Sequence, residues 1–453
     1  MSRVVVGHSV RGIPTHMEHQ TRGIEWMVAR ERAGKHSGGF LCDDMGLGKT
    51  VQMIGAMTQH KLPRTLVIVP VSLVYQWVEH VRSWSHLSVS CLGSGEDTDV
   101  VIATYSHCLQ SSKLYGNLFE HVWDRVVLDE AHEVRNPRSK KFHTVMSLRG
   151  RIRWMMTGTL IVNSERDYKT LLRFLTHDEE CLEQRRDIIL KRTKKMVHLQ
   201  LPQLTFENIR LDPYPEESES YEELFRALGP IDEPKKVLKA IIKMRQAGIH
   251  PALVDPGYTG SSKRLDTLVD MITAYPDEKV LVFCHFKHEM KMIKTRLSAT
   301  RVLTFHGGVP MQTRALRVKE FTECIGGAVF LIQIKAGSVG LNLQAATRVF
   351  ITSPAWNPAT ELQAISRSHR IGQDRAVHVH KLFYSGLEEA IIQLQESKCH
   401  INATLFEDES LADELPMPLD LERALMSIHR FFCVPGVNDE ATSTSAPCVA
   451  PRG

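Results

Sequence analysis

The sequence predicts an α/β protein with two lobes, each built on a parallel sheet that helices flank. Three observations support this fold class: short apolar runs alternate with helical stretches over residues 1–195, the texture changes over 196–260, and a second alternation covers 261–400. Such alternation is typical of parallel strands joined by crossover helices. A chain of 453 residues is also long enough for roughly two to three domains, each with its own core.

The first predicted domain, residues 1–195, contains its strands as short runs rich in apolar and β-branched residues. One run enters a glycine-rich stretch at Phe40, and the others lie at 66–69, 100–103, 126–128 and 154–156. In parallel sheets the active residues lie beyond the carboxyl ends of the strands, so we expect the functional side chains of this lobe at that edge.

Two further regions follow. Residues 196–260 hold several prolines, an acidic run at 216–223 and a basic amphipathic stretch, which together predict a helical connector between the lobes. Residues 261–400 form the second predicted lobe. Its candidate strands are 280–284, 302–305, 329–334, 348–352 and 377–383.

Residues 401–453 form a predicted tail, which is acidic and then rich in Ser, Thr, Pro and Ala. A 4-3-4 spacing of apolar residues within it predicts one amphipathic helix, and residues 438–453 are predicted to be disordered. The apolar residues that mark this helix are Leu421, Leu425, Ile428 and Phe432.

The composition is that of an ordinary globular protein, with 43% hydrophobic residues, 24% charged residues and a net charge of +4. Basic residues cluster, as at 191–195, but such a run is usually a solvated face and indicates nucleic acid only weakly. No stretch approaches the about eighteen apolar residues of a membrane helix, and residues 1–10 lack an apolar core, so neither membrane spanning nor secretion is predicted.

The nine cysteines are scattered along the chain. No two have the spacing of about two to four residues that is typical of a zinc-binding pair. We therefore expect buried free thiols in a reducing compartment, and no zinc.

The segment 40–50, FLCDDMGLGKT, predicts a strand, a tight turn and a helix. Such a turn directs backbone N–H groups and a helix N-terminus at one point, which suits a triphosphate. Lys49 is then expected on the β- and γ-phosphates and Thr50 on Mg²⁺. The usual first glycine of this pattern is Asp43 here, so a glycine-rich turn followed by a chance Lys-Thr stays an alternative.

A second stretch, 125–132 (RVVLDEAH), is a β-branched run that ends in two adjacent carboxylates. At the carboxyl end of a strand beside the phosphate loop, Asp129 can hold Mg²⁺ through water, and Glu130 can polarise the attacking water. The alternative is an exposed strand end. The two stretches together make nucleotide hydrolysis the leading hypothesis.

The segment 363–373 (QAISRSHRIGQ) carries the chemistry of the second lobe. Arg367 and Arg370 are three residues apart, so on a helix they project from one face. Two guanidinium groups so placed can reach phosphate charge on a nucleotide held by the other lobe. The alternative is a surface helix rich in arginine.

These motifs occur in an order that resembles the Swi/Snf-type ATPases of helicase superfamily two, a DEAH-box variant. The resemblance covers about residues 13–395, and the family also carries aspartate at the position of Asp43. The matching segments are 43–50 (DDMGLGKT), 129–132 (DEAH), 157–159 (TGT), 335–343 (KAGSVGLNL), 356–361 (WNPATE) and 363–373.

The resemblance implies two RecA-like lobes, the cofactors ATP and Mg²⁺, and DNA-dependent ATP hydrolysis. It further implies translocation along double-stranded DNA and the remodelling or displacement of DNA-bound proteins, as in chromatin remodelling. The implied partners are double-stranded DNA and DNA-bound proteins, with no membrane and no zinc. The expected location is nuclear, or cytoplasmic for a viral or bacterial protein, and not secreted.

The resemblance also assigns roles to residues, with Gln20 as the adenine-reading glutamine and the two arginines as arginine fingers. The implied catalytic residues are Lys49, Asp129, Glu130, Arg367 and Arg370, with Thr50 and Asp129 on Mg²⁺. The implied nucleotide-binding residues are Gln20, Asp43, Asp44, Met45, Gly46, Leu47, Gly48, Lys49, Thr50, Gly340 and Gln363. The implied DNA contacts are Ser72, Gln76, Thr104, Tyr105, Lys335, Gly337 and Trp356, of which Trp356 fits a core aromatic equally well.

Two departures from the family pattern stand out. Leu160 follows 157–159 where the family usually has proline, so we expect a looser turn between hydrolysis and lobe movement, and Ser338 replaces a common glycine. The subgroup that the motifs resemble often inserts a zinc-binding finger between the lobes, which the cysteine spacing excludes. We therefore expect a nearly bare motor.

Two other functions remain open. One is a strand-separating helicase on DNA or RNA, and the other is an inactive scaffold, against which the intact catalytic residues argue. Strand-separating helicases commonly carry an inserted hairpin in the second lobe. The segment between Gly340 and Gln363 has no room for its roughly ten or more residues, so we expect translocation without unwinding.

Overall fold

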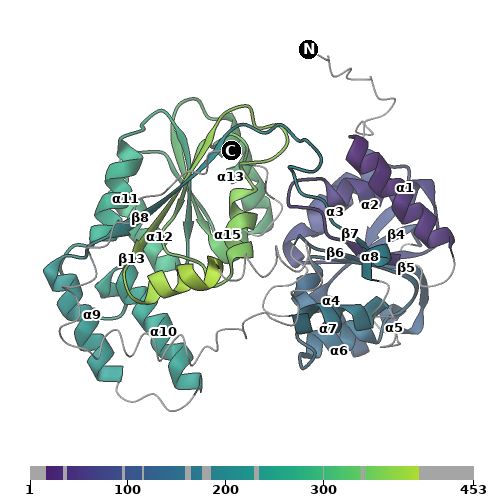
Figure 1. The fold of residues 1–453 in the computed structure, drawn as a ribbon, viewed down its shortest axis with the longest axis horizontal. Coiled ribbons are helices and arrows are strands. Elements are labelled where there is room, and N and C mark those ends of the chain that lie inside the picture. Colours follow the sequence, from purple (N-terminus) through teal and green to yellow (C-terminus); the bar gives the residue numbers. More distant parts are fainter. Residues whose placement is uncertain are drawn as a thin grey trace, which may run out of the picture.

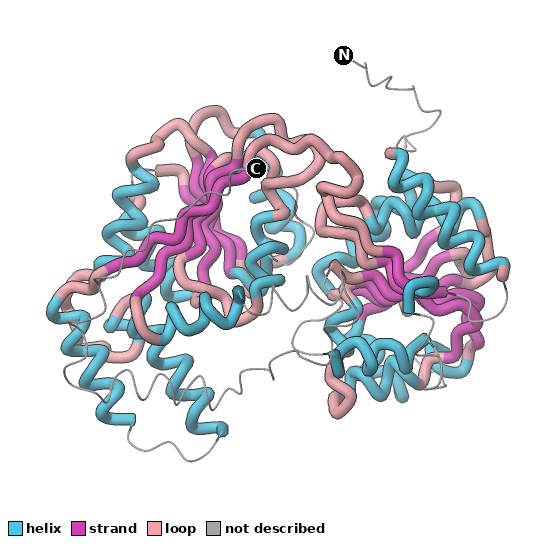
Figure 2. Tube along the Cα trace, viewed as in Figure 1, coloured by secondary structure: helices cyan, strands magenta, loops and turns pink. Residues whose placement is uncertain are grey.

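The structure, a computed structural model, describes the chain in ten stretches. Within them the chain forms two separate sheets, each with helices on both faces (Figure 1, Figure 2). The predicted fold class, two α/β lobes with parallel sheets, is confirmed. The described residues are 17–33, 38–93, 97–114, 117–158, 165–175, 185–228, 234–298, 300–337, 341 and 343–396.

The first sheet has seven strands in the order β3-β4-β2-β5-β6-β1-β7, and neighbouring strands are parallel. Its strands are β1 Gly38–Leu41, β2 Thr65–Val69, β3 Val89–Cys91, β4 Val100–Thr104, β5 Val122–Asp129, β6 Arg149–Met156 and β7 Ile189–Leu190. The helices are α1 Glu18–Arg32, α2 Lys49–Gln59, α3 Val74–Trp84, α4 Tyr105–Leu114, α5 Asn117–Glu120, α6 Lys140–Met146, α7 Glu165–Leu175 and α8 Arg185–Ile188.

The second sheet has six strands in the order β10-β11-β9-β12-β13-β8, again with parallel neighbours. Its strands are β8 Leu204–Leu211, β9 Lys279–Cys284, β10 Val302–Phe305, β11 Ala328–Gln333, β12 Arg348–Ile351 and β13 Val377–Tyr384. The helices are α9 Pro215–Leu228, α10 Pro234–Ile249, α11 Lys263–Thr273, α12 Lys287–Arg296, α13 Met311–Glu323, α14 Ile334–Gly337 and α15 Pro358–Ile365, and residues 387–396 are also helical.

Every strand expected from the sequence is present, and three strands were missed. Strands β3 and β7 are short and lie at the two edges of the first sheet. Strand β8 falls in the segment that was expected to be a helical connector, yet it pairs with β13 along its whole length. It is an edge strand whose side chains are mostly half-buried or exposed, so its apolar alternation is weak. The domain boundaries themselves remain a prediction.

Alternation along the strands sends side chains to opposite faces of each sheet. In the first sheet, Val67 and Val69 pack with α1, α2 and α3, whereas Leu66 and Ile68 pack with α4, α6 and α7. In the second sheet, α13 and α15 cover one face and α11 and α12 the other. Burial of each large apolar side chain stabilises the fold by about 1.5–3 kcal/mol, so the strand ends that carry the site are firmly placed.

The structure can also be compared with the expectations for the cysteines, for membrane helices and for the tail. Cys42, Cys108 and Cys284 are buried free thiols as predicted, whereas Cys91, at the end of an edge strand, is exposed. No helix among the described residues is long and apolar enough to cross a membrane. The amphipathic helix and the disorder predicted for the tail lie outside the described residues.

Candidate active site

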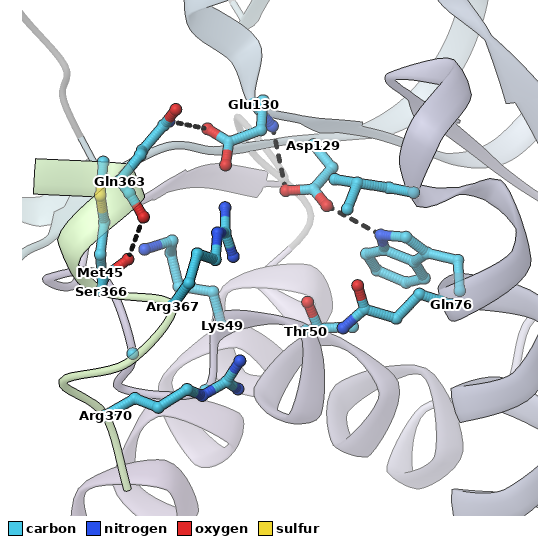
Figure 3. Close-up of a pocket in the computed structure, with 14 residues that line it drawn as sticks. Met45, Lys49, Thr50, Gln76, Asp129, Glu130, Gln363, Ser366, Arg367 and Arg370 are labelled. Atoms are coloured by element: carbon cyan, nitrogen blue, oxygen red, sulfur yellow. Dashed lines mark hydrogen bonds between the residues drawn. The ribbon is translucent and has the colours of Figure 1, made fainter. Parts of the chain in front are cut away.

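A cavity lies between the two lobes, at the carboxyl ends of the strands of the first sheet. Figure 3 shows Lys49, Arg367 and Arg370 turned into one space, with Asp129 and Glu130 along its edge. The first lobe contributes Met45, Gly46, Gly48, Lys49, Thr50, Leu73, Gln76, Trp77, Asp129 and Glu130, and the second contributes Gln363, Ser366, Arg367 and Arg370. The structure therefore brings the five predicted catalytic residues together.

The phosphate loop follows β1 and leads into α2 as predicted. Gly46 and Gly48 have left-handed backbones, with φ of 93° and 82°, a conformation that glycine adopts without steric cost. The helix begins at Lys49, whose Nζ donates to the backbone oxygens of Asp43 at 2.7 Å and Asp44 at 3.3 Å. The ammonium thus lies within the turn, at a helix N-terminus that favours anions.

Gln20 lies against this loop from α1. Its Nε2 donates to Leu47 O at 3.3 Å, and its Oε1 accepts from Met17 N at 3.0 Å. A Cβ added to Gly48 would lie 2.5 Å from the same amide nitrogen, and the left-handed backbone at Gly48 itself favours glycine. The predicted adenine-reading residue is therefore next to the loop, and its role toward the base stays a prediction.

The side chain of Asp43, a predicted nucleotide-binding residue, is committed to contacts within the protein, and the nucleotide-binding role of the residue stays a prediction. Its carboxylate is fully buried and accepts two hydrogen bonds from Arg192, at 2.9 and 2.5 Å, and one from Gln52 at 2.9 Å. Asp44 accepts from the backbone N of Lys194 at 3.2 Å, and Leu47 is buried. None of these three side chains lines the cavity: Asp43 is engaged by Arg192, Asp44 by the backbone of Lys194, and Leu47 by the core.

The two carboxylates stand at the end of β5. Asp129 accepts from Trp77 Nε1 at 2.8 Å and from Glu130 N at 2.9 Å. Glu130 has a left-handed backbone with φ of 51°, a strained conformation for a residue other than glycine that is typical of functional sites. Burial, with the Glu130 carboxylate beside it, raises the pKa of Asp129 to about 6.

The pKa of Glu130 shifts the other way. Burial alone would raise it, but contact with the His132 ring and the charges of Lys49 and Arg367 outweigh burial and lower it. The buried Asp129 carboxylate and the half-buried Glu130 carboxylate, beside the Thr50 hydroxyl, are a set of hard oxygen donors that would suit a divalent cation such as Mg²⁺. Asp129 and Thr50 are the residues that would hold it.

The arginines of the second lobe lie in a turn that follows α15, and not on a helix as the spacing suggested. The helix ends at Ile365, after which the backbone bonds span three residues, from Arg367 N to Ala364 O at 3.2 Å and from Ser368 N to Ile365 O at 3.1 Å. Gln373 holds the turn that follows: its Nε2 donates to Ser368 O at 3.2 Å, Gln344 O at 2.9 Å and Ala346 O at 3.1 Å. We call residues 366–370 the arginine turn. Both arginines still line the cavity.

Contacts across the cavity join the lobes. Gln363 Nε2 donates to Glu130 Oε2 at 3.4 Å. Burial lowers the pKa of Arg367 to about 10, although the nearby Glu130 carboxylate opposes the shift. The predicted charge from the second lobe therefore faces the hydrolytic pair of the first.

Three of the predicted DNA contacts lie elsewhere. Thr104 and Tyr105 are buried: the Thr104 hydroxyl accepts from His107 N at 3.0 Å, and the Tyr105 hydroxyl donates to Asp129 O at 2.8 Å. Gln76 lines the nucleotide cavity. Thr104 and Tyr105 are buried because they lie where β4 ends among neighbouring parallel strands, whereas Gln76 reaches the cavity from α3. A DNA contact by these three residues stays a prediction that their observed contacts do not support.

The remaining predicted DNA contacts are more accessible. Ser72 is half-buried, Lys335 is exposed, and Gly337 ends α14. Trp356 is half-buried and packs against a cluster that contains Met244, so the core role that fitted it equally well is the one its contacts favour. Gly340, Leu160 and Ser338 lie outside the described residues.

Sequence reasoning missed three residues that shape the site: Trp77, Arg192 and Lys194. Trp77 is buried and its indole positions Asp129. The two cations belong to the basic run at 191–195, which suggested only a solvated face. The place of this run in the chain could have revealed its role. It directly follows β7, the strand beside β1, so it lies at the same sheet edge as the phosphate loop.

The fold and the site define a class of protein: a two-lobed enzyme that binds a nucleotide between parallel sheets and hydrolyses it. The sequence matches the SNF2-related domain over residues 19–186 and the helicase conserved C-terminal domain over residues 263–372.

Comparison with individual proteins supports the same family. A protein named "Probable global transactivator" of Orgyia pseudotsugata multicapsid polyhedrosis virus is 30% identical over 82% of this chain and 86% of its own. The chain therefore belongs to the Swi/Snf-type ATPases of helicase superfamily two, and it is an ATP hydrolase.

More distant relatives are longer proteins. A Bacillus subtilis protein named as an ATP-dependent helicase/translocase is 28% identical over 88% of this chain, and a mouse SWI/SNF-related regulator of chromatin is 25% identical over 94%. The chain spans about half the length of these two, 49% and 47%. The solved ATPase core of Sulfolobus solfataricus SWI2/SNF2 in complex with double-stranded DNA is 27% identical, with a TM-score of 0.42, and the match covers 93% of this chain and 96% of that one.

Proposed function

We propose that the chain is a DNA-dependent ATPase that translocates on double-stranded DNA and remodels or displaces proteins bound to it. One observation carries the proposal: the phosphate loop and the hydrolytic carboxylates come from one lobe, and two arginines come from the other. A site divided in this way couples hydrolysis to the relative position of the lobes, which is what a motor requires.

Each residue has a role that its position supports. Loop N–H groups and Lys49 bind the phosphates, and Glu130 orients the attacking water and accepts its proton. Arg367 and Arg370 stabilise the charge that develops on the transferred phosphoryl group. Mg²⁺, when bound by Thr50 and Asp129, supplies further neutralisation of the phosphate oxygens. Gln20 is proposed to contact the adenine.

The choice of DNA as the track rests on the relatives, whose names include a helicase/translocase and a chromatin regulator. We propose that DNA is held mainly through its phosphates, so that affinity falls steeply with salt and varies little with base sequence. Lys335, exposed on α14, is a candidate contact.

Translocation is favoured over strand separation. In the described residues 343–363, the chain forms β12, a turn and the start of α15, and no hairpin stands there as a wedge. Opening a duplex also costs about 1.4 kcal/mol per base-pair step, a cost that movement along intact duplex avoids.

The test is an ATPase assay of the purified chain without nucleic acid and with single-stranded DNA, double-stranded DNA or RNA. We expect the strongest stimulation by double-stranded DNA, with ATP-dependent displacement of a triplex-forming strand. Equal rates in all four conditions would refute DNA dependence. Efficient unwinding of a forked duplex would replace translocation with the helicase function.

A further inference from the structure

The basic run at 191–195, which we call the strap, follows the phosphate loop closely. The backbone N of Asp44 donates to Arg192 O at 2.9 Å, and the backbone N of Lys194 donates to the Asp44 carboxylate at 3.2 Å. These contacts extend the pairing of β1 with β7 beyond the strands themselves. The strap is therefore attached to the loop at two successive points.

Arg192 makes the attachment rigid. Its guanidinium binds the Asp43 carboxylate with two hydrogen bonds, donates to Gln52 Oε1 at 2.7 Å, and donates to His19 O. One side chain thus joins α1, the loop and α2. Asp43 is fully buried, so its negative charge needs the guanidinium of Arg192 as a partner. If the strap left the loop, that carboxylate would be buried without a counter-charge, which is strongly unfavourable.

Lys194 extends from the strap to the second lobe. Its Nζ donates to the backbone oxygen of His369, in the arginine turn, at 3.2 Å. A Cβ placed on Gly46 would lie 3.8 Å from Lys194 Cε and 3.7 Å from Arg370 Cβ. The phosphate loop, the strap and the arginine turn therefore meet at one point.

Three cationic side chains, Lys194, Arg370 and Lys49, lie near this point, with Asp44 as the nearby anion. Burial lowers the pKa of Lys194, and the nearby charges of Arg370 and Lys49 lower it further, while Asp44 opposes them. Three cationic side chains brought together repel one another when the lobes close. The phosphates of a nucleotide would offset that repulsion, so closure in this arrangement favours an anionic ligand.

We propose that Lys194 is a positioning residue for ATP hydrolysis, which fastens the arginine turn of the second lobe over the phosphate loop when the lobes close. The inference rests on the proposed ATPase function and assigns a role to a residue outside the motifs of the family resemblance. Because His369 precedes Arg370, the contact fixes how far that arginine stands from the loop. Its loss lowers the fraction of closed molecules and leaves the phosphate-binding residues of the first lobe in place.

The test uses the full chain with Lys194→Ala, Lys194→Arg and the matched control Lys195→Ala, since Lys195 is the adjacent lysine and is exposed. Dyes on the two lobes report closure by energy transfer when a non-hydrolysable ATP analogue is added. Steady-state kinetics with double-stranded DNA give kcat and KM, and thermal melting reports stability.

We expect Lys194→Ala to lower kcat about tenfold and to reduce the analogue-induced closure, with analogue affinity and melting temperature nearly unchanged. Lys194→Arg retains a cationic donor and should restore part of both, and Lys195→Ala should behave as the wild type. Full closure by Lys194→Ala, or an equal defect in Lys195→Ala, would overturn the proposal. A loss of analogue affinity with closure intact would also overturn it, since it would make Lys194 a phosphate ligand.

The closure measurement needs neither turnover nor DNA. If the wild-type chain fails to hydrolyse ATP with DNA, the proposed function fails, while the closure signal of Lys194→Ala still decides the positioning role.

Discussion

The two lobes hold their parts of the nucleotide site by different means. In the first lobe an ion pair between the fully buried Asp43 and Arg192 fastens the phosphate loop to α1 and α2. In the second lobe a neutral amide, that of Gln373, joins Ser368 O in the arginine turn to Gln344 O and Ala346 O outside it. The phosphate loop lies between α1 and α2, whereas the arginine turn follows the end of α15.

This difference separates two tasks. A loop fixed by a buried ion pair is an anion site that exists whether or not the lobes are closed, because its contacts are nearly all within one lobe. The arginine turn contributes only when it is brought to that loop. Binding should therefore depend on the first lobe and turnover on both, which mutations in each lobe can test.

The largest expected contrast is between Lys49→Ala and Arg370→Ala. Loss of Lys49 removes a phosphate contact, so both ATP affinity and turnover should fall. Loss of Arg370 should lower kcat by about 10³-fold or more while ATP affinity is largely retained. Stopped-flow binding of a fluorescent ATP and steady-state ATPase rates measure the two effects, with Arg375→Ala, whose side chain is more than half exposed, as a control.

This comparison breaks down if Arg370→Ala loses ATP affinity as severely as Lys49→Ala. In that case the second lobe would be part of the binding site, and the division of tasks would be wrong.

Within the first lobe, Glu130→Gln should separate binding from chemistry. The amide keeps the size of the side chain but cannot accept the proton of the attacking water, so turnover should fall about a hundredfold or more. ATP affinity should stay near that of the wild type or rise, because one negative charge near the phosphates is removed. Quenched-flow measurement of single-turnover hydrolysis would reveal a normal burst if Glu130 has no part in the chemical step.

Much of this site could be predicted from the sequence, because some residue types have few alternative uses in their setting. Glycines before Lys49, and paired carboxylates that end a β-branched run, allow a local interpretation that needs no tertiary information. The parallel strands followed from apolar alternation in the same way. The described structure contains the glycine-rich loop, the carboxylate pair and every predicted strand.

What the sequence did not reveal depends on contacts between distant segments. The spacing of Arg367 and Arg370 fits a helix, but the backbone after Ile365 turns with three-residue hydrogen bonds, and a distant amide, that of Gln373, binds Ser368 O in the turn. The run at 191–195 has the composition of a solvated face, and only its place beside β1 turns Arg192 toward Asp43. The sequence around a polar residue at a strand end is the same whether that residue contacts DNA or hydrogen-bonds to a buried carbonyl, so sequence alone cannot distinguish the two roles.

A smaller effect should follow from Gln373→Ala, which removes the amide that holds the arginine turn. The turn should become less ordered, so kcat should fall about tenfold with little change in ATP affinity. Gln203→Ala is a suitable control, because that side chain is exposed beside β8. A decrease in ATP affinity larger than the decrease in kcat would show that the turn also contributes to binding.

The smallest effect expected is that of Tyr105→Phe, and it decides between two assignments of one residue. The sequence resemblance implied a DNA contact, whereas the structure buries the ring and directs its hydroxyl to Asp129 O. Removal of the hydroxyl leaves that buried carbonyl without this donor, so the free energy of unfolding should fall by about 1–3 kcal/mol. Affinity for double-stranded DNA, measured by fluorescence anisotropy, should not change. Tyr75→Phe, at a tyrosine that is 64% exposed, should leave stability unaltered and serves as the control. A clear loss of DNA affinity in Tyr105→Phe with stability intact would restore the DNA contact and require the strand end to open when DNA binds.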